Sequence, residues 1–192
     1  MRYRLLLACL LTLSCSQEGS AGPGRDSSLA IMQAETQTSA SIVVTSPAFA
    51  ANGPIPLRHS AYGDGIAPAL SWSGLPPGTK SLALAMEDPD AMSARPFVHW
   101  LAWNIAPAAG GLAQGRLPAG AAEGKTSRGS TGYFGPRPHG SSPHHYHFQL
   151  FALDSPLSLP AGASRPQLLA AMKGHVLAKG DLVGLFAEPK GR

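Results

Sequence analysis

Two groups of acidic, imidazole and phenolic side chains stand well apart in the middle of the chain. The first contains Asp88 and Asp90 and is followed by His99, and the second contains His144 and Tyr146. Carboxylates accept hydrogen bonds, whereas imidazole and phenol groups can donate them to an anion. If the fold brings the two groups together, they form one small polar pocket. Such a set of side chains favours holding a small anion or zwitterion over breaking a covalent bond.

Strand-like segments flank both groups of residues. The expected strands cover residues 42–45, 69–72, 81–87, 97–105, 146–153 and 182–186, with Gly- and Pro-rich turns between them. Segment 97–105 is apolar on both faces, which predicts a central strand that is covered on both sides. Asp88 directly follows segment 81–87, and functional residues are often held where rigid strands end. These patterns predict a mainly β fold.

His99 lies within the apolar segment 97–105, where strict alternation places it on the same face as Leu101 and Trp103. A histidine in such a segment is either a structural core residue or part of a site. The nearby Asp88 and Asp90 favour the site, although Asp-Pro-Asp can also be a plain turn. Both readings stay open at this point.

The strand period of two sorts the histidines of the second group onto two faces. His144 and Tyr146 share one face, and His145 and His147 point to the other. A four-histidine metal cage that includes His139 is therefore not expected. A zinc or copper site at His145 and His147 stays open, but it lacks a third ligand. We accordingly predict no metal.

A stiff loop is predicted between the two halves of the site. Gly135, Pro136 and Pro138 restrict the backbone, so the loop can present its groups to a ligand at little cost in entropy.

One helix has clear signals late in the chain. Ser164 and Gln167 have the spacing of a capping box, in which the two side chains satisfy free backbone N–H groups. Apolar residues then recur at helical spacing, namely Leu168, Leu169, Met172 and Val176. Gly180 is well placed to end this helix.

The first residues predict export. A basic start precedes an apolar run at 5–13, which is too short to span a bilayer and ends at Ser14-Cys15. Residues 1–15 resemble a lipoprotein signal, so we expect Cys15 to carry lipid on the periplasmic or outer surface of a membrane. Plain signal cleavage and a retained leader are the alternatives. We expect residues 16–40 to be a flexible tether and 41–192 to be the folded domain.

Composition excludes several classes of function. Cys9 and Cys15 are the two cysteines and both lie in the leader, so the domain has neither a disulfide nor a thiol nucleophile. Loss of Arg2 and Arg4 with the leader lowers the count of Lys and Arg from 15 to 13, against 11 acidic residues. This near-neutral balance does not indicate a nucleic-acid partner.

Catalytic and cofactor motifs are missing from the sequence. No serine stands in a Gly-x-Ser-x-Gly elbow. Residues 124–126 (Gly-Lys-Thr) resemble the end of a phosphate loop, but Ala119 stands where its first glycine is required. We expect no enzyme activity and no cofactor. A hydrolase that uses His99 or His144 as a general base is the weakest hypothesis.

A series of short motifs runs from about residue 46 to residue 186. In chain order they are Ser46-Pro47-Ala48-Phe49, Ile55-Pro56, Pro68-Ala69-Leu70-Ser71-Trp72, Leu75-Pro76-Pro77-Gly78-Thr79-Lys80-Ser81, Asp88-Pro89-Asp90-Ala91, His99-Trp100, Asn104-Ile105 and Gly135-Pro136. Each motif is weak alone, whereas their order and spacing together are specific. They resemble the phosphatidylethanolamine-binding protein (PEBP) family, in its bacterial branch described as Raf-kinase-inhibitor-like.

The resemblance implies a sandwich-like antiparallel β-sheet core, one or two peripheral C-terminal helices and a small pocket for phosphate-like anions. The candidate ligand-binding residues are Asp88, Asp90, His99, Gly135, Pro136, Pro138, His144 and Tyr146. The chain departs from the family pattern at three positions: Met92 replaces a proline, His139 replaces the second proline of a pair, and His145 replaces an arginine.

The leading hypothesis is an exported binding protein that holds a phosphate-like anion or a phosphoethanolamine-type zwitterion without catalysis. Asp88 would either fix the tautomer of a neighbouring imidazole or face the ammonium group of the zwitterion. The alternative, implied mainly by the family, is inhibition of a partner protease or kinase through the pocket and the 106–145 loop region.

Overall fold

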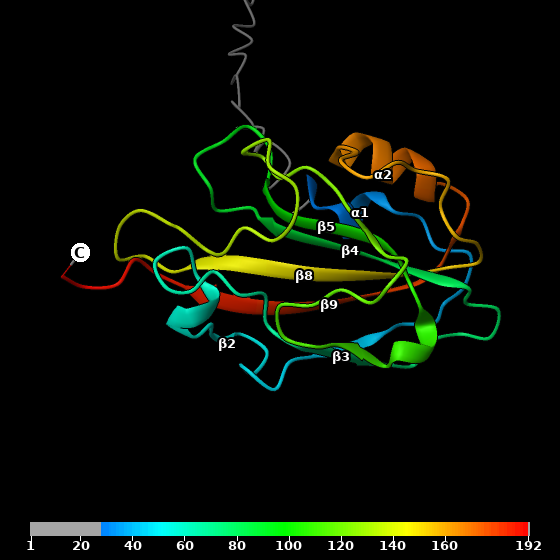
Figure 1. Cartoon of the computed structure of the whole chain (residues 1–192), viewed down its shortest axis with the longest axis horizontal. Helices are drawn as coiled ribbons and strands as arrows, with labels where there is room; N and C mark the ends of the chain where they lie inside the picture. The colour runs from blue at the N-terminus through cyan, green and yellow to red at the C-terminus, as the bar shows by residue number, and fades with distance from the viewer. Residues whose placement is uncertain (1–27, 192) are drawn as a thin grey trace, which may run out of the picture.

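The computed structural model describes residues 28–191, which form a mainly β structure with two short α-helices (Figure 1). The strands are β1 (Val43–Thr45), β2 (Gly53–Pro54), β3 (Leu70–Ser73), β4 (Ser81–Asp88), β5 (Phe97–Ile105), β6 (Gly111–Leu112), β7 (Ala122–Glu123), β8 (His144–Leu153) and β9 (Val176–Phe186). The helices are α1 (Ala30–Gln33) and α2 (Arg165–Met172). The predicted fold class is confirmed.

Two sheets pack face to face. The larger has the strand order β2-β9-β8-β4-β5-β7, and the smaller has the order β1-β3-β6. Neighbouring strands are antiparallel except for the short parallel pair β2–β9. The space between the sheets is filled by apolar side chains from both, among them Trp72 from β3 and Phe148 from β8. This core makes the structure sandwich-like.

The centre of the larger sheet is buried on both faces. All eight residues of β4 are buried, and so are seven of the nine residues of β5, as the apolar character of 97–105 predicts. A second apolar layer, which includes Leu101 and Trp103, lies on the face of the larger sheet away from the smaller one. Helices α1 and α2 cover this face (Figure 1).

Helix α2 begins as predicted and ends earlier. Gln167 Oε1 accepts hydrogen bonds from the backbone N–H and the hydroxyl of Ser164 at 2.9 and 2.8 Å. The helix ends at Met172 because Gly174 takes a left-handed conformation with φ of 79°. The predicted continuation to Gly180 is wrong, since Val176–Phe186 alternates between buried and half-buried positions as strand β9.

Gly180 has a different function from the predicted helix stop. A Cβ atom at this position would lie 2.1 Å from the carbonyl oxygen of Ile42. The glycine therefore allows the chain before β1 to cross β9 closely.

The segment before β1 belongs to the folded domain, which corrects the predicted tether over its described residues. Leu29 and Ala30 are buried against the larger sheet. The ammonium group of Lys179 donates hydrogen bonds to the carbonyl oxygens of Ile31 and Ala34 at 2.6 and 2.8 Å and so satisfies the end of α1. Residues 1–27, with the predicted signal, Cys15 and the first part of the tether, lie outside the described residues.

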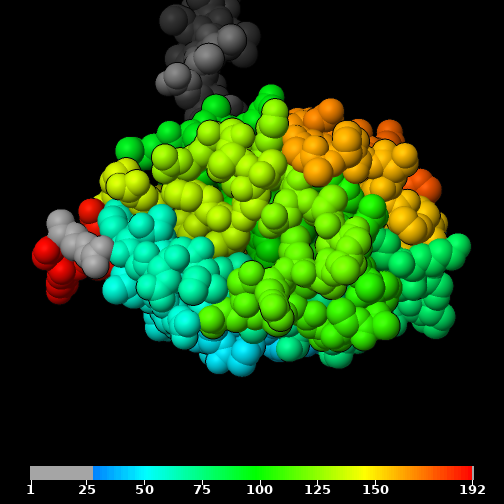
Figure 2. Space-filling view, in the orientation of Figure 1, coloured from blue at the N-terminus to red at the C-terminus, as the bar shows by residue number. Residues whose placement is uncertain are grey.

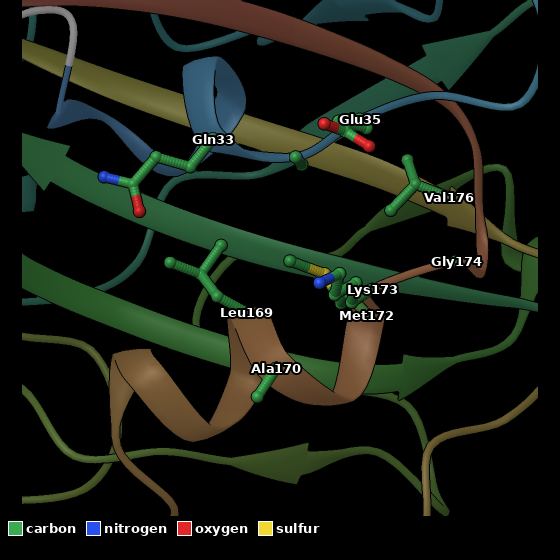
Figure 3. Close-up of a pocket in the computed structure, with 9 residues that line it drawn as sticks. Gln33, Glu35, Leu169, Ala170, Met172, Lys173, Gly174 and Val176 are labelled. Carbon is green, nitrogen blue, oxygen red and sulfur yellow. The ribbon is translucent and has the colours of Figure 1, made fainter.

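A cavity of about 370 Å³ separates the two helices on this face. Its walls carry Gln33 and Glu35 from the α1 side and Leu169 and Met172 from α2 (Figure 3).

A buried carboxylate holds the N-terminal segment and α2 on the sheet. The Glu87 side chain is fully buried and accepts hydrogen bonds from the N–H of Ala30 at 2.7 Å and from Gln149 Nε2 at 2.9 Å. The Arg165 guanidinium forms an ion pair with the same carboxylate and also donates to the carbonyl oxygen of Ser28. A buried charge needs such partners, because an unpaired one is costly.

Removing the arginine should destabilise the fold. We expect Arg165→Met to lower the free energy of unfolding by about 3–5 kcal/mol, because the Glu87 carboxylate then stays buried without a counter-charge. Urea unfolding measures the change, and adding Glu87→Gln should restore part of it. Arg58→Met, at an exposed arginine, is the matched control. Equal stability of the Arg165 and Arg58 variants would contradict the role of this ion pair.

Candidate ligand-binding site

A β-bulge in β5 turns His99 toward the site. Met86 pairs with Trp100 and the next residue of β4, Glu87, pairs with Val98, so that His99 is the extra residue in the ladder. Bulges re-aim side chains in this way. The His99 ring contacts that of Tyr146, with centroids 5.1 Å apart, and does not share the face of Leu101 and Trp103. The strict alternation expected for His99 is therefore wrong.

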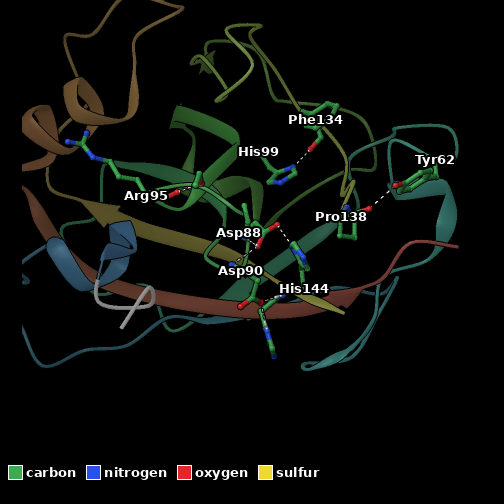
Figure 4. A network of polar contacts seen from close by, with 11 residues as sticks. Tyr62, Asp88, Asp90, Arg95, His99, Phe134, Pro138 and His144 are labelled. Atoms are coloured by element: carbon green, nitrogen blue, oxygen red, sulfur yellow. Dashed lines mark hydrogen bonds and ion pairs between the residues drawn. The ribbon is translucent and has the colours of Figure 1, made fainter. Parts of the chain in front are cut away.

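The His99 ring is buried, and its tautomer is defined by one hydrogen bond. Nδ1 lies 2.7 Å from the carbonyl oxygen of Phe134, which can only accept, so Nδ1 carries the proton (Figure 4). Burial lowers the pKa of His99 to about 4, against the opposing influence of this hydrogen bond and of the Asp88 charge. At neutral pH, Nε2 is consequently an acceptor.

Both carboxylate oxygens of Asp88 are engaged at the end of β4. Oδ1 accepts hydrogen bonds from the N–H groups of Asp90 and Ala91 at 2.8 and 3.1 Å, which shapes the following turn. Oδ2 lies 2.8 Å from Nδ1 of His144 (Figure 4). Asp88 thus fixes the orientation of the His144 ring, and Nε2 of that ring is left for a ligand.

Tyr146 lies beneath His99 and His144 and is fully buried. Its ring stacks on that of His144 with centroids 6.5 Å apart. Burial and the nearby charge of Asp88 raise the pKa of Tyr146, so its hydroxyl keeps its proton. Among the described residues this buried hydroxyl makes no hydrogen bond of normal geometry, although the Asp88 carboxylate and the backbone at Arg137 lie close to it. An unpaired buried donor is unfavourable, and a ligand or water in the site would satisfy it.

The 134–139 loop forms one wall, but its first residues face elsewhere. The backbone at Gly135 packs against the chain at His59, whose carbonyl oxygen would lie 2.6 Å from an added Cβ. The carbonyl oxygen of Pro136 accepts a hydrogen bond from the N–H of Ala61 at 3.0 Å. The glycine and this proline therefore support the loop from behind.

Pro138 holds the front of the loop. Its carbonyl oxygen accepts a hydrogen bond from the Tyr62 hydroxyl at 2.7 Å (Figure 4). The Arg137 guanidinium lies over the Tyr62 ring, 5.7 Å from its centroid. The loop is thus tied to the neighbouring 57–65 region, and Figure 2 shows how the chain around residues 106–140 spreads over this face of the molecule.

Asp90 stands at the rim rather than in the cavity. It accepts hydrogen bonds from the backbone N–H and from Nδ1 of His145 at 2.8 and 2.7 Å. Partial burial opposes ionisation, but these hydrogen bonds prevail and lower the pKa of Asp90. Asp90 and His145 therefore fasten the turn after β4 to the start of β8.

The cavity measures about 400 Å³, a size suited to a small ligand. Its lining residues are Asp88, Ala91, Met92, Ser93, Phe97, His99, Phe134, Arg137, Pro138, His139 and His144. The structure thus brings Asp88, His99 and His144 together, with Tyr146 directly beneath them. Two of the departures from the family pattern, Met92 and His139, lie in the wall, and Met92 is almost fully exposed.

Sequence reasoning missed three lining residues of clear chemical relevance: Phe97, Phe134 and Arg137. Arg137 stands between Pro136 and Pro138 in the predicted loop, and that position could have marked it as a cation next to the anion pocket. The aromatic residues carried no comparable signal.

No metal site or membrane-spanning helix is found in the described residues. Within 28–191, no three His, Cys, Asp or Glu side chains converge as a metal-binding group. His145 and His147 pair instead with different carboxylates, Asp90 and Asp181. None of the helices in this part of the chain has the length and apolar character needed to cross a bilayer.

The fold and the pocket agree with comparisons to known proteins. The family model described as phosphatidylethanolamine-binding protein matches residues 45–187. The chain belongs to this family, which confirms the resemblance seen in its motifs. The crystal structure of CT736 from Chlamydia trachomatis superposes with a TM-score of 0.72 at 37% identity, covering 78% of this chain and 99% of that one. YbcL from Escherichia coli, described as a member of the mammalian PEBP family, gives 0.70 at 28% identity, covering 77% and 99%.

Relatives of known sequence are closer still. A UPF0098 protein of Methanothermobacter thermautotrophicus is 46% identical over 144 residues, which are 72% of this chain and 94% of the relative. LppC of Mycobacterium tuberculosis, which bears the name "Putative lipoprotein", is 42% identical over 146 residues, covering 76% of this chain and 72% of that protein.

The low pKa of His99 should make folding sensitive to acid. The unfolded chain takes up this proton near pH 6.5 and the folded protein near pH 4, so the stability due to neutral His99 is lost as the pH falls from 6.5 to 4. Between pH 7 and pH 4, we expect the free energy of unfolding of His99→Gln to fall by on the order of 3 kcal/mol less than that of the unaltered protein. Urea unfolding at pH 7 and pH 4 measures it, with exposed His139→Gln as the control. An unchanged pH dependence in the His99 variant would contradict the burial of a neutral ring.

Proposed function

We propose that the pocket binds a small phosphate-like anion or a phosphoethanolamine-type zwitterion and does not catalyse a reaction. The observation that carries the proposal is the His144 ring in the cavity wall, which Asp88 orients so that Nε2 is left for a ligand, with the buried hydroxyl of Tyr146 beside it. A bound phosphoryl oxygen would accept a hydrogen bond from this hydroxyl and remove the cost of leaving it unpaired.

The other groups around the cavity complement an anion. Arg137 is the arginine among the lining residues, with its guanidinium over the Tyr62 ring, and a protonated His144 would add an N–H donor at Nε2. Asp88 acts through His144, which favours the first of the two accounts for this carboxylate over direct contact with an ammonium group. Nε2 of His99 is then the acceptor for a ligand N–H or O–H group.

The same geometry argues against hydrolysis. Ser93 is the serine among the lining residues of the cavity, and its Oγ donates to the carbonyl oxygen of Arg95 at 2.5 Å. Within residues 28–191 this hydroxyl is hydrogen-bonded to a backbone carbonyl and to no imidazole or carboxylate, so it is not activated as a nucleophile. A site with oriented donors and an unactivated hydroxyl supports binding without turnover.

Charge-assisted hydrogen bonds of about 1.5–3 kcal/mol each, less the cost of immobilising a small ligand, suggest micromolar to millimolar affinity. We expect calorimetry at low salt to give saturable heat with phosphate and phosphoethanolamine. His144→Ala and Tyr146→Phe should each weaken binding by about tenfold, because each removes one donor.

Two controls sharpen this experiment. His175→Ala removes an exposed imidazole that pairs with Asp154 and is not part of the cavity wall, and it should leave affinity unchanged. Tyr146→Phe should change the free energy of unfolding little in the absence of ligand, since the hydroxyl it removes makes no hydrogen bond of normal geometry. No saturable heat, or equal affinities for His144→Ala and His175→Ala, would refute the assignment.

We further propose that the protein is exported and attached to a membrane through lipid on Cys15. The basic start, short apolar run and Ser14-Cys15 support this proposal, as does the name of the LppC relative. The anchor would be the lipid itself, since the apolar run is too short to span a bilayer.

Replacing the cysteine tests the anchor. We expect Cys15→Ala to abolish incorporation of radiolabelled palmitate in a bacterial expression host and to release the protein from the membrane fraction. Cys9→Ala, within the apolar run, is the matched control and should leave labelling intact. Equal labelling of both variants would disprove lipidation at Cys15.

A further inference from the structure

A second cavity, of about 450 Å³, lies next to the ligand pocket. The two cavities share no lining residue, but they use neighbouring residues of the same two segments. His99 and Phe134 line the first, and the next residue along β5, Trp100, lines the second together with Tyr133. The wall between the cavities is therefore one chain thick at these residues.

A carboxylate is fixed in the second cavity. Glu123 lies on β7, opposite Ala102 of β5, and its backbone carbonyl accepts a hydrogen bond from the N–H of Gly162 at 2.8 Å. Its side-chain Oε1 accepts a hydrogen bond from the indole N–H of Trp100 at 2.8 Å. These contacts hold the carboxylate in one orientation, which lowers the entropy cost of binding a ligand to it.

In the described part of the chain, the other carboxylate oxygen, Oε2, is not engaged in the hydrogen bond that Trp100 makes with Oε1 or in any other side-chain hydrogen bond. A Cβ atom on Gly132 would lie 3.4 Å from Oε2, and Gly132 has a φ of 90° that other residues rarely adopt. Because Gly132 has no side chain, there is space beside Oε2 that a side chain would partly fill. Within residues 28–191, no Lys, Arg or His forms an ion pair with Glu123.

The remaining walls suit an organic cation. The rings of Trp100 and Tyr133 meet edge to face, with centroids 5.6 Å apart at 83°. Tyr133 donates its hydroxyl to the carbonyl oxygen of His59 at 2.6 Å, so this hydroxyl does not compete for Glu123. A half-buried carboxylate beside aromatic rings attracts cations by charge and by the ring faces.

We propose that this second cavity binds an ammonium or guanidinium group through Oε2 of Glu123. The ligand must carry N–H donors, because the carboxylate oxygen offers a hydrogen bond as well as charge. Arg116 also lines the cavity and repels a bound cation, so it reduces affinity. This site shares no lining residue with the anion pocket, and it prefers ligands of the opposite charge.

NMR titration tests the proposal on the full domain. Ethylammonium and methylguanidinium chloride should shift the indole N–H signal of Trp100 saturably and leave those of Trp72 and Trp103 in place. Tetramethylammonium, which has no N–H group, should bind at least about tenfold more weakly.

Matched variants separate binding from structure. Glu123→Gln keeps an acceptor for Trp100 but removes the charge, and should weaken cation binding by about tenfold. Glu35→Gln makes the same charge change at an exposed residue outside the cavity and should have no effect. Arg116→Gln should strengthen binding.

Three outcomes would overturn the proposal: no saturable shift at Trp100, equal affinities for the Glu123 and Glu35 variants, or weaker cation binding in Arg116→Gln. Phosphate binding measured in Glu123→Gln should equal that of the unaltered protein, so failure here is distinguishable from failure of the anion pocket.

Discussion

The extra residue in β5 is the feature on which the site depends. Without the bulge, regular alternation would place His99 with Leu101 and Trp103 under the helices, away from Tyr146. The bulge instead aims His99 at the inner side of the sandwich, next to Trp100. This ladder irregularity thus supplies a polar ring to the anion pocket, whereas Trp100 keeps its regular place on the inner face, where its indole N–H reaches the carboxylate of Glu123.

Polar groups in this molecule are placed mostly by other polar groups. Asp88 orients His144, the Phe134 carbonyl orients His99, and Trp100 orients Glu123. Each contact leaves one atom of the pair available to a ligand while fixing the other. Such preorganisation compensates for the small number of groups that a cavity of this size can hold.

Much of the fold could be predicted from sequence because strand signals are local. Segment 97–105 was apolar on both faces and is a central strand, and Ser164 begins a helix as its capping box predicts. Of the eight candidate ligand-binding residues, Asp88, His99, Pro138 and His144 line the cavity. The bulge could not be predicted, since it depends on how β5 pairs with β4 in three dimensions. Gly180 was misread because its close approach to Ile42 is a long-range contact.

The N-terminal segment was missed for a related reason. Its polar composition resembles a tether, and its order comes from distant partners such as Glu87, Gln149 and Lys179. Two adjacent residues of β4 have different partners: Glu87 binds the N-terminal segment, and Asp88 is hydrogen-bonded to His144. A force that pulled on the chain ahead of residue 28 would act on the sheet at Glu87. This residue is adjacent to Asp88, whose carboxylate orients the imidazole of the pocket.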